Sequence, residues 1–276
     1  MRNLRYFVSI FLVIILSLGI FHIALAGNSF IIGDLRVDLP EVYNARDYRV
    51  HIAPGGLPTT GDNRDFTTAW LGVFLGQYDG STGSGKFSQV GIETTKLGVK
   101  WFVYAEPGVT CLRGTKHPTL SECIGDFGDL VSLNTYTRVE LKKNLNEPYW
   151  RAIVYDVNSV GYVVAQIPDN SNRIYLARSD TEEGYYESTD PFIAASFYHW
   201  HPQYVNGTSW TDWPTSTGGA GNSKIYASPS SICPAHYGAT PNVYGNERAW
   251  WAGSGGVVCE WLLFPSVHVY LPLVSR

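Results

Sequence analysis

The stretch that decides the fold runs from Ala69 to Glu106 and reads AWLGVFLGQYDGSTGSGKFSQVGIETTKLGVKWFVYAE. It contains three short runs rich in Val, Phe, Tyr, Trp and Ile, at 69–75, 87–93 and 100–106. A Gly/Ser-rich loop joins the first two runs, and the tight TKLG connection joins the last two. Short aromatic and β-branched runs bounded by glycine are typical of strands rather than helices, so we expect a three-stranded meander.

Runs of the same kind follow the meander to the end of the chain. We expect strands at 130–142, 149–157, 161–167, 173–178, 192–200, 224–227, 257–264 and 267–274, with loops at 107–127 and 229–245 and a charged turn at 181–183. The sequence shows no helix of usual length and no internal repeat. It therefore predicts an all-β fold in a single antiparallel sandwich domain over residues 66–276.

The first 26 residues are typical of a signal peptide. Arg2 and Arg5 precede an apolar run at 7–20, and Ala24-Leu25-Ala26 supplies a small-x-small cleavage site. The alternative is a membrane-anchoring helix, but the run is near the lower length limit for spanning a bilayer. We expect residues 1–26 to be removed, which leaves a secreted protein without a membrane segment. Residues 27–65 then form an N-terminal extension, in which 48–52 could be an edge strand.

Charge and composition exclude one class of partner. The chain has 20 Lys and Arg against 24 Asp and Glu, a net charge of −4 with neutral histidines. It lacks the basic surface that a nucleic-acid-binding protein needs. Aromatic residues make up 14% of the chain, nearly as many as the 16% that are charged, which suits an extracellular β-protein.

The four cysteines predict two disulfides, because an even count behind a signal peptide is typical of an oxidising compartment. Three pairings are possible. Pairing Cys111 with Cys123 and Cys233 with Cys259 closes the two shortest loops, and we expect that pairing. No C-x-x-C pair exists, so metal binding by these thiols is the weaker alternative.

Four short motifs together resemble the eqolisin-type glutamic peptidases. They are W-x-G-V at 70–73, Q-x-G at 89–91, an aromatic strand with Trp at 101–107, and G-D-x-V at 128–131. The resemblance covers about a third of the chain without its signal peptide and implies a concanavalin A-like jelly-roll sandwich. It also implies a site on the concave face, where the Trp and Gln of these motifs correspond to Trp70 and Gln89.

The resemblance fails at the residue that the family's chemistry needs most. In that family a Glu carboxylate takes a proton from water while the Gln amide stabilises the oxyanion. By chain order the strand that should hold the Glu is 193–198, which contains none. The only Glu-Trp pair is at Glu260, late in the chain, so Gln89 and Glu260 are the candidate catalytic pair.

Strand alternation gives a check that does not depend on the family. Gln89, Gly91 and Glu93 share one face of their expected strand, and the intervening residues Ser88, Val90 and Ile92 suit a core. Gln89 then lies on a polar face. The alternative is that Gln89 is an ordinary solvated or sheet-bridging amide.

Two further patterns in the sequence are candidate sites. His199 and His201 fall on one side of an expected strand and could bind a metal with His236 or Asp212, but an H-x-H pair without clear further ligands is usually structural. Asn206 begins a glycosylation sequon that matters only in a glycosylating host. No motif predicts a metal or a cofactor.

The sequence thus predicts a secreted β-sandwich that binds an extended polymer, either a polysaccharide or a polypeptide, through Trp70, Gln89 and Trp101 on a concave face. The first alternative is a glutamic peptidase-like hydrolase using Gln89 and Glu260. The second is a structural cell-surface module without a site.

Overall fold

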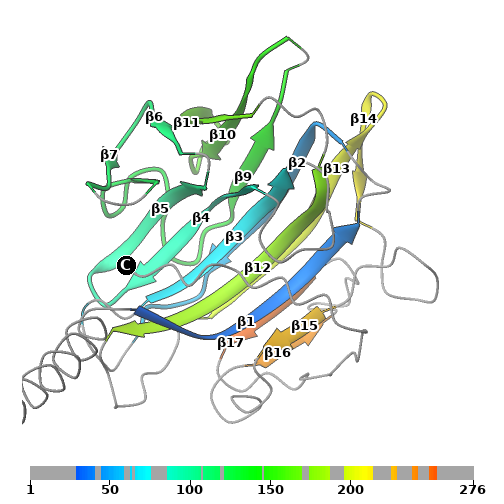
Figure 1. Cartoon of the computed structure of the whole chain (residues 1–276). Helices are drawn as coiled ribbons and strands as arrows, with labels where there is room; N and C mark the ends of the chain where they lie inside the picture. The colour runs from blue at the N-terminus through cyan, green and yellow to red at the C-terminus, as the bar shows by residue number, and fades with distance from the viewer. Residues whose placement is uncertain are drawn as a thin grey trace, which may run out of the picture.

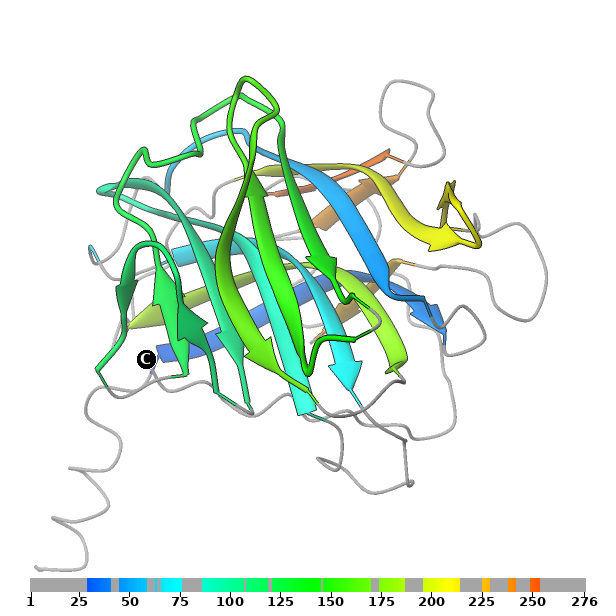
Figure 2. The ribbon, with the colours of Figure 1, turned by 90° about the horizontal axis from the view of Figure 1, so that it is seen from above.

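Two antiparallel β-sheets lie face to face in the computed structural model of the chain (Figure 1). The structure describes residues 29–253 except 41–44, 59–62, 64–65, 76–85, 107, 119–120, 145, 170–173, 187–195, 214–224, 229–237 and 242–248. Figure 2, seen from above, shows the two sheets as stacked layers.

The first layer, sheet A, has eight strands. Their order is β15 (Ile225–Ser228), β1 (Ser29–Pro40), β12 (Ile174–Tyr186), β3 (Phe66–Leu75), β4 (Lys86–Thr95), β5 (Gly98–Ala105), β8 (Glu122–Ile124) and β7 (Thr115–Lys116). The expected meander is its central part, β3, β4 and β5.

The second layer, sheet B, has nine strands. Their order is β16 (Gly238–Pro241), β17 (Ala249–Gly253), β13 (Phe197–Asn206), β2 (Asp47–Pro54), β9 (Thr137–Lys142), β10 (Tyr149–Tyr155), β11 (Gly161–Pro168) and β6 (Thr110–Cys111). Strand β14 (Ser209–Asp212) lies off this path and pairs with β13.

The core fills the space between the sheets because successive strand residues point to opposite faces. In β3, Leu71 and Val73 are fully buried in it, and β9 contributes Val139 and Leu141 in the same way. Trp101 of β5 is the largest side chain of this core that is fully buried. The predicted all-β class and sandwich architecture are confirmed.

The N-terminal extension is part of the sandwich rather than an addition to it. Strand β2 contains the expected 48–52 strand, but it lies inside sheet B between β13 and β9, not at an edge. Strand β1 also comes from this segment and pairs with β12 and β15 in sheet A. Both sheets therefore need residues before 66.

One expected strand and one expected turn differ from the structure. The strand expected at 130–142 begins only at Thr137, because Leu130 and Asn134 have φ angles of 63° and 55°, in the left-handed region that breaks a strand. The charged turn expected at 181–183 is wrong: these residues continue β12, which pairs with β1 on one side and β3 on the other. Pairing on both sides overrides the local turn signal.

Strand limits also differ around His199. The strand expected at 192–200 is β13, which runs from Phe197 to Asn206, and residues 191–195 are outside the described part. The expected loop at 107–127 contains three short strands, β6, β7 and β8. The signal peptide and the strands expected at 257–264 and 267–274 lie outside the described residues.

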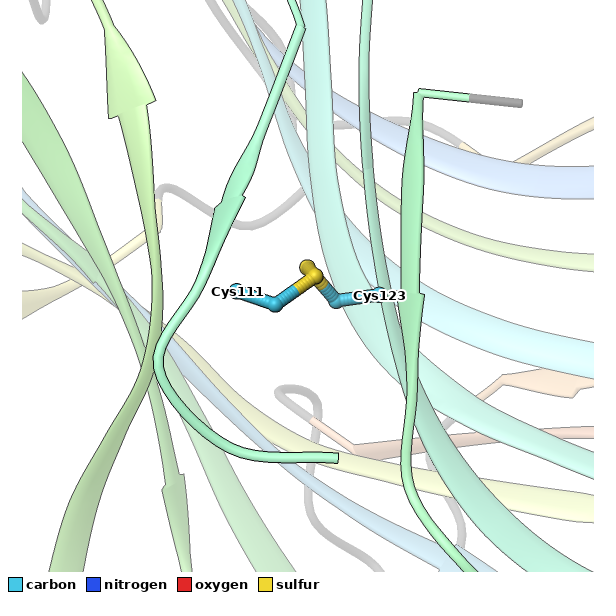
Figure 3. The surroundings of a disulfide bond; sticks show 2 residues. All are labelled: Cys111 and Cys123. Carbon is cyan, nitrogen blue, oxygen red and sulfur yellow. A yellow bond between two sulfur atoms is a disulfide. The ribbon is translucent and has the colours of Figure 1, made fainter. Parts of the chain in front are cut away.

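The disulfide between Cys111 and Cys123 confirms the first of the two predicted pairs. Cys111 lies in β6 at the end of sheet B, and Cys123 lies in β8 of sheet A. Figure 3 shows the two side chains meeting between those strands. The bond therefore joins the two sheets at one edge of the sandwich. Cys233 and Cys259 lie outside the described residues.

A search of the described residues for membrane spans finds no helix that is both long and apolar enough to cross a bilayer.

Candidate functional site

The face of sheet A that points away from sheet B carries the site candidates, and we call it the Gln89 face. Its register pairs place Trp70 of β3 beside Gly91 of β4, and Gly72 of β3 beside Gln89 of β4. Trp70 and Gln89 are both buried, with exposed fractions of 0% and 6%. The structure therefore brings these two predicted residues together on one face.

Glycines at two motif positions make room for aromatic rings on this face. A Cβ at Gly72 would lie 2.6 Å from Cζ3 of Trp70 and 2.8 Å from Cε2 of Phe87. A Cβ at Gly91 would lie 2.3 Å from the carbonyl oxygen of Ala69 and 2.5 Å from Cβ of Trp70. The Trp70 ring thus lies over the backbone of its own strand, which only glycine at position 72 permits.

The aromatic side chains form a separate buried cluster on the Gln89 face, made of Trp70, Phe74, Phe87 and Phe102, with the half-buried Tyr104 packed against it. The Trp70 and Phe87 rings meet edge to face, with centroids 5.2 Å apart. This cluster fixes the Trp70 ring next to Gln89.

Strand β12 adds a buried acidic side chain and a buried basic side chain to the same face. Asp180 pairs with Trp70 in register, and Arg178 pairs with Gly72. Their exposed fractions are 0% and 1%. The Arg178 guanidinium carbon lies 5.1 Å from the centroid of the Phe74 ring. Phe74 is two residues beyond Gly72, the register partner of Arg178, on the side away from Asp180. Gln89 and Asp180 therefore come from the two strands that flank β3, with Asp180 in the row of Trp70 and Gln89 in the neighbouring row of Gly72.

The sequence pattern points to neither β12 residue, because it predicts a strand that ends at 178 and a charged turn at 181–183. One signal was available. Arg178 and Asp180 alternate with Ala177, Ser179 and Thr181 in a period-two pattern that is typical of a strand with one distinct face.

Other carboxyl groups lie further along the Gln89 face. Glu93 forms a 2.8 Å ion pair with Lys100. Glu122 pairs with Tyr104 in register. Glu106 accepts a hydrogen bond from the backbone N–H of Phe87, but burial raises the pKa of its carboxyl group.

The pKa of Tyr104 is also raised. Burial is the largest cause, and the neighbouring carboxylates of Glu106 and Glu122 act in the same direction. This end of the face therefore disfavours negative charge.

Trp101 does not belong to this face. It lies on the opposite side of sheet A, fully buried in the core between the sheets. Its indole N–H donates to Asp129 at 3.0 Å, and Arg113 makes a two-pronged pair with the same carboxylate. The Trp101 ring and the Asp129 of the G-D-x-V motif thus hold the disulfide loop on the sandwich. A ligand on the Gln89 face cannot touch this ring.

The two histidines considered for metal binding have different partners. His199 is fully buried and contacts the hydroxyl groups of Ser179 and Thr181 in sheet A. His201 has a φ of 46° at a register shift in β13, and its Nδ1 lies 3.1 Å from an Asp212 oxygen. The shift breaks the strand alternation on which the expectation rested. Within the described residues, no three His, Cys, Asp or Glu side chains come together as a metal site would require.

Two other predicted residues are Asn206 and Glu260. Asn206 is exposed at the end of β13, where a glycan on its side chain would meet solvent. Glu260 lies outside the described residues, so its place relative to Gln89 stays a prediction.

Comparison with known proteins gives matches at the level of structure only. No family model matches the chain, and no curated protein matches it in sequence. A crystal structure of scytalido-glutamic peptidase with a transition state analog inhibitor matches with a TM-score of 0.43 and 9% identity, covering 71% of this chain and 98% of that one.

Two other solved structures match in a similar way. Scytalido-glutamic peptidase with a peptide-based transition state analog gives a TM-score of 0.42 and 10% identity, over 71% of this chain and 98% of that chain. SCP-B, a member of the eqolisin family of peptidases in complex with the tripeptide Ala-Ile-His, gives 0.36 and 11% identity, over 66% and 84% of the two chains. The chain therefore has a weak, partial likeness to eqolisin-type glutamic peptidases.

Proposed function

We propose that the chain is a secreted hydrolase that binds an extended polymer, most simply a polypeptide, along the Gln89 face and cleaves it with Gln89 and Asp180. One observation carries this proposal: an amide on β4 and a carboxylate on β12 lie on the same face of sheet A, in adjacent register rows on either side of β3. Neighbouring strands lie about 4.8 Å apart, so the two backbones are about 10 Å apart across β3. Gln89 is in register with Gly72 and Asp180 with Trp70, so the two residues are also offset by two positions along β3. The proposal places the attacking water between their side chains, beside the Trp70 ring.

The chemistry follows from the two side chains. The Asp180 carboxylate removes a proton from the water, and the water oxygen attacks the carbonyl carbon of the scissile bond. The Gln89 amide N–H donates to the oxyanion that forms. The protonated Asp180 then gives its proton to the leaving nitrogen as the bond breaks. Asp180 thus takes the role that the sequence assigned to Glu260.

Trp70 and Arg178 support this arrangement in different ways. The edge-to-face contact with Phe87 and the close approach to Gly72 fix the Trp70 ring. Asp180 lies in register with Trp70, and Arg178, two residues away, has its guanidinium over the Phe74 ring. Secretion is part of the proposal, and the Cys111–Cys123 disulfide is compatible with an extracellular protein.

Binding of a polysaccharide or polypeptide without cleavage is the second candidate. The observation that favours it is the presence of Arg178 two residues from Asp180 on the same strand face. A nearby cation stabilises a carboxylate in its ionised form, which weakens it as a base. In that case Gln89 and Asp180 would bind groups of the polymer rather than activate water.

Hydrolysis is tested with the purified chain and a denatured, unlabelled protein substrate at intervals from pH 2 to pH 7. We expect new amino termini to appear, and we expect Gln89→Ala and Asp180→Asn each to reduce their rate of formation by about 100-fold or more. Glu93→Gln is the matched control, because Glu93 is a buried carboxylate of the same face that is already paired with Lys100.

The outcomes separate the candidates. Loss of cleavage in Glu260→Gln with full activity in Asp180→Asn would return the catalytic role to Glu260. No cleavage at any pH, together with retention of the denatured polymer by wild type but not by Gln89→Ala, would support binding alone. Equal activity in all the variants would contradict both candidates.

A further inference from the structure

The outer face of sheet B carries a surface of a different kind. On β2, Val50 and Ile52 are fully buried in the core, so Arg49 and His51 face outward. Aromatic and polar side chains gather around them from β14, β13, β9, β10 and the turn before β9. We call this surface the platform; its members are Arg49, His51, Tyr136, Arg138, Tyr155, Trp200, His201, Gln203, Trp210 and Asp212.

Strand register orders the platform into rows. Trp200 of β13 lies opposite His51 of β2, which lies opposite Arg138 of β9. In the next row, Gln203 lies opposite Arg49. Figure 1 shows the strands β13, β2 and β9 side by side, with the β14 hairpin at one end. Three strand spacings from β13 to β10 span about 14 Å, enough for several rings of an oligosaccharide.

The aromatic rings of the platform are held in place but reach solvent. The Arg49 guanidinium lies 3.9 Å from the Trp210 ring centroid, and that of Arg138 lies 3.5 Å from the Tyr155 ring. The Trp200 and Tyr136 rings meet edge to face, with centroids 5.7 Å apart, and Tyr136 is 42% exposed. One face of the Trp200 ring stacks on the His201 ring, with centroids 5.4 Å apart, which leaves the other face for a ligand. The aromatic cluster of the Gln89 face, by contrast, is buried almost completely.

The polar side chains form one connected network beside these rings. Arg49 Nε donates to the Gln203 amide oxygen at 2.7 Å, and the Gln203 amide nitrogen donates to Asp212 at 2.6 Å. The same Asp212 oxygen lies 3.1 Å from His201 Nδ1. A planar amide, a carboxylate, an imidazole and a guanidinium thus present fixed donors and acceptors next to flat apolar rings.

The charges of this network are already balanced within the protein. Arg49 connects to Asp212 through Gln203, and the carboxylate of Glu140 lies near both Arg49 and Arg138. A charged ligand would have to displace one of these pairings. A ligand with hydroxyl groups can instead add donors and acceptors to the network while its apolar faces cover the rings.

We propose that the platform is a binding site for a neutral oligosaccharide chain. The rings of Trp200, Trp210 and Tyr136 stack on the faces of the sugar rings. The hydroxyl groups of the sugar form hydrogen bonds with Gln203, Asp212 and His201. The site is separate from the Gln89 face, and it functions whether or not the chain is a hydrolase.

Calorimetric titration of the full chain with cellohexaose, laminarihexaose and chitohexaose tests the proposal, and we expect at least one of them to bind. Trp200→Ala and Trp210→Ala should each weaken that binding by about tenfold, which corresponds to the loss of one stacking contact. Trp200→Phe keeps a flat ring and should restore part of the affinity. Phe127→Ala is the control, since Phe127 is an aromatic residue 47% exposed beside Gly98, at the end of sheet A. Gln89→Ala and Asp180→Asn should bind as the wild type does.

Four results would overturn the proposal. The first is that none of the three oligosaccharides binds. The second is unchanged binding by a Trp200→Ala/Trp210→Ala double variant whose melting temperature shows that it is folded. The third is binding of polygalacturonate alone, which would assign the surface to acidic polymers. The fourth is self-association in sedimentation that the double variant abolishes, which would assign it to a second copy of the chain.

Discussion

Single residues on the Gln89 face show how closely the packing depends on side-chain size. Alternation along β4 correctly placed Gln89 and Glu93 on one face and Val90 and Ile92 in the core. The reason for the glycines at 72 and 91 was not visible in the sequence, because it depends on how the Trp70 ring lies over its own strand. The expected ligand contact of Trp101 is wrong, because an aromatic strand residue can face either the core or the ligand side and this one faces the core.

We predict that Gly91→Ala destabilises the fold more than Gly72→Ala. At Gly91 the new methyl group meets the carbonyl oxygen of Ala69 at 2.3 Å, and backbone cannot move aside as a side chain can. At Gly72 it meets only ring atoms of Trp70 and Phe87. Overpacking of this kind costs about 1–3 kcal/mol of unfolding free energy, which urea denaturation measures.

Gly56→Ala is the control for both substitutions, since no heavy atom lies within 4 Å of a Cβ there. Its unfolding free energy should stay within about 0.5 kcal/mol of the wild type. Equal stability of the Gly91→Ala and Gly56→Ala variants would show that the backbone of β3 does not approach position 91 as closely as described.

The sequence predicts the individual strands better than it predicts which strands pair with each other. The meander β3–β4–β5 has strong local signals, short connections and antiparallel partners that follow in sequence. Strand β2 looked like an edge strand because its partners, β9 and β13, lie far along the chain. The sequence of β12 indicates a strand followed by a turn, because charged residues at 181–183 are typical of turns. Backbone pairing with β1 and β3 on both sides keeps these residues in the strand. Asp180 was missed for that reason.

At the same scale, the Cys111–Cys123 bond should add to the unfolding free energy, because it links the two sheets. It closes a loop with a sequence separation of 12 and joins β6 of sheet B to β8 of sheet A. A loop of that size limits the unfolded chain enough to contribute about 3 kcal/mol. We expect a Cys111→Ala/Cys123→Ala variant to lose about that much unfolding free energy in urea, while the predicted Cys233 and Cys259 pair stays in place.

Reductant provides the control for the disulfide. In the double variant, any remaining effect of reductant reports on the other two cysteines alone. A wild type and double variant with the same urea midpoint would contradict a stabilising role for this bond.

For the whole molecule, buried histidines and buried carboxyl groups act on stability in opposite directions. Burial lowers the pKa of His199 to about 3 and, with neighbouring Arg138 and Arg49, that of His51 to about 4. Their unfolded forms bind protons first, so both histidines reduce stability as the pH falls from about 6.5. Burial raises the pKa of Glu106 and Glu140, whose folded forms hold protons longer, so these two groups reduce stability as the pH rises above about 4.5.

We predict that His199 causes the larger part of the loss of unfolding free energy as the pH falls below about 6.5. Its neutral ring contacts two hydroxyl groups, at Ser179 and Thr181, and with one N–H it donates to one of them and accepts from the other. Protonation would replace the acceptor with a second donor inside the core. Between pH 6.5 and pH 3 this single group should reduce the unfolding free energy by up to about 1.4 kcal/mol per pH unit.

His199→Gln removes the titrating group but keeps one donor and one acceptor in the core. Its unfolding free energy should therefore change less steeply with pH in that window than the wild type's, whatever its stability at pH 7. His117→Gln makes the same substitution at a histidine outside the core and is the matched control for the change of side chain. Parallel curves for wild type and His199→Gln would show that His199 binds a proton as readily in the folded state as in the unfolded state. A shallower curve would extend the pH range in which the proposed Gln89 and Asp180 chemistry can be measured on folded protein.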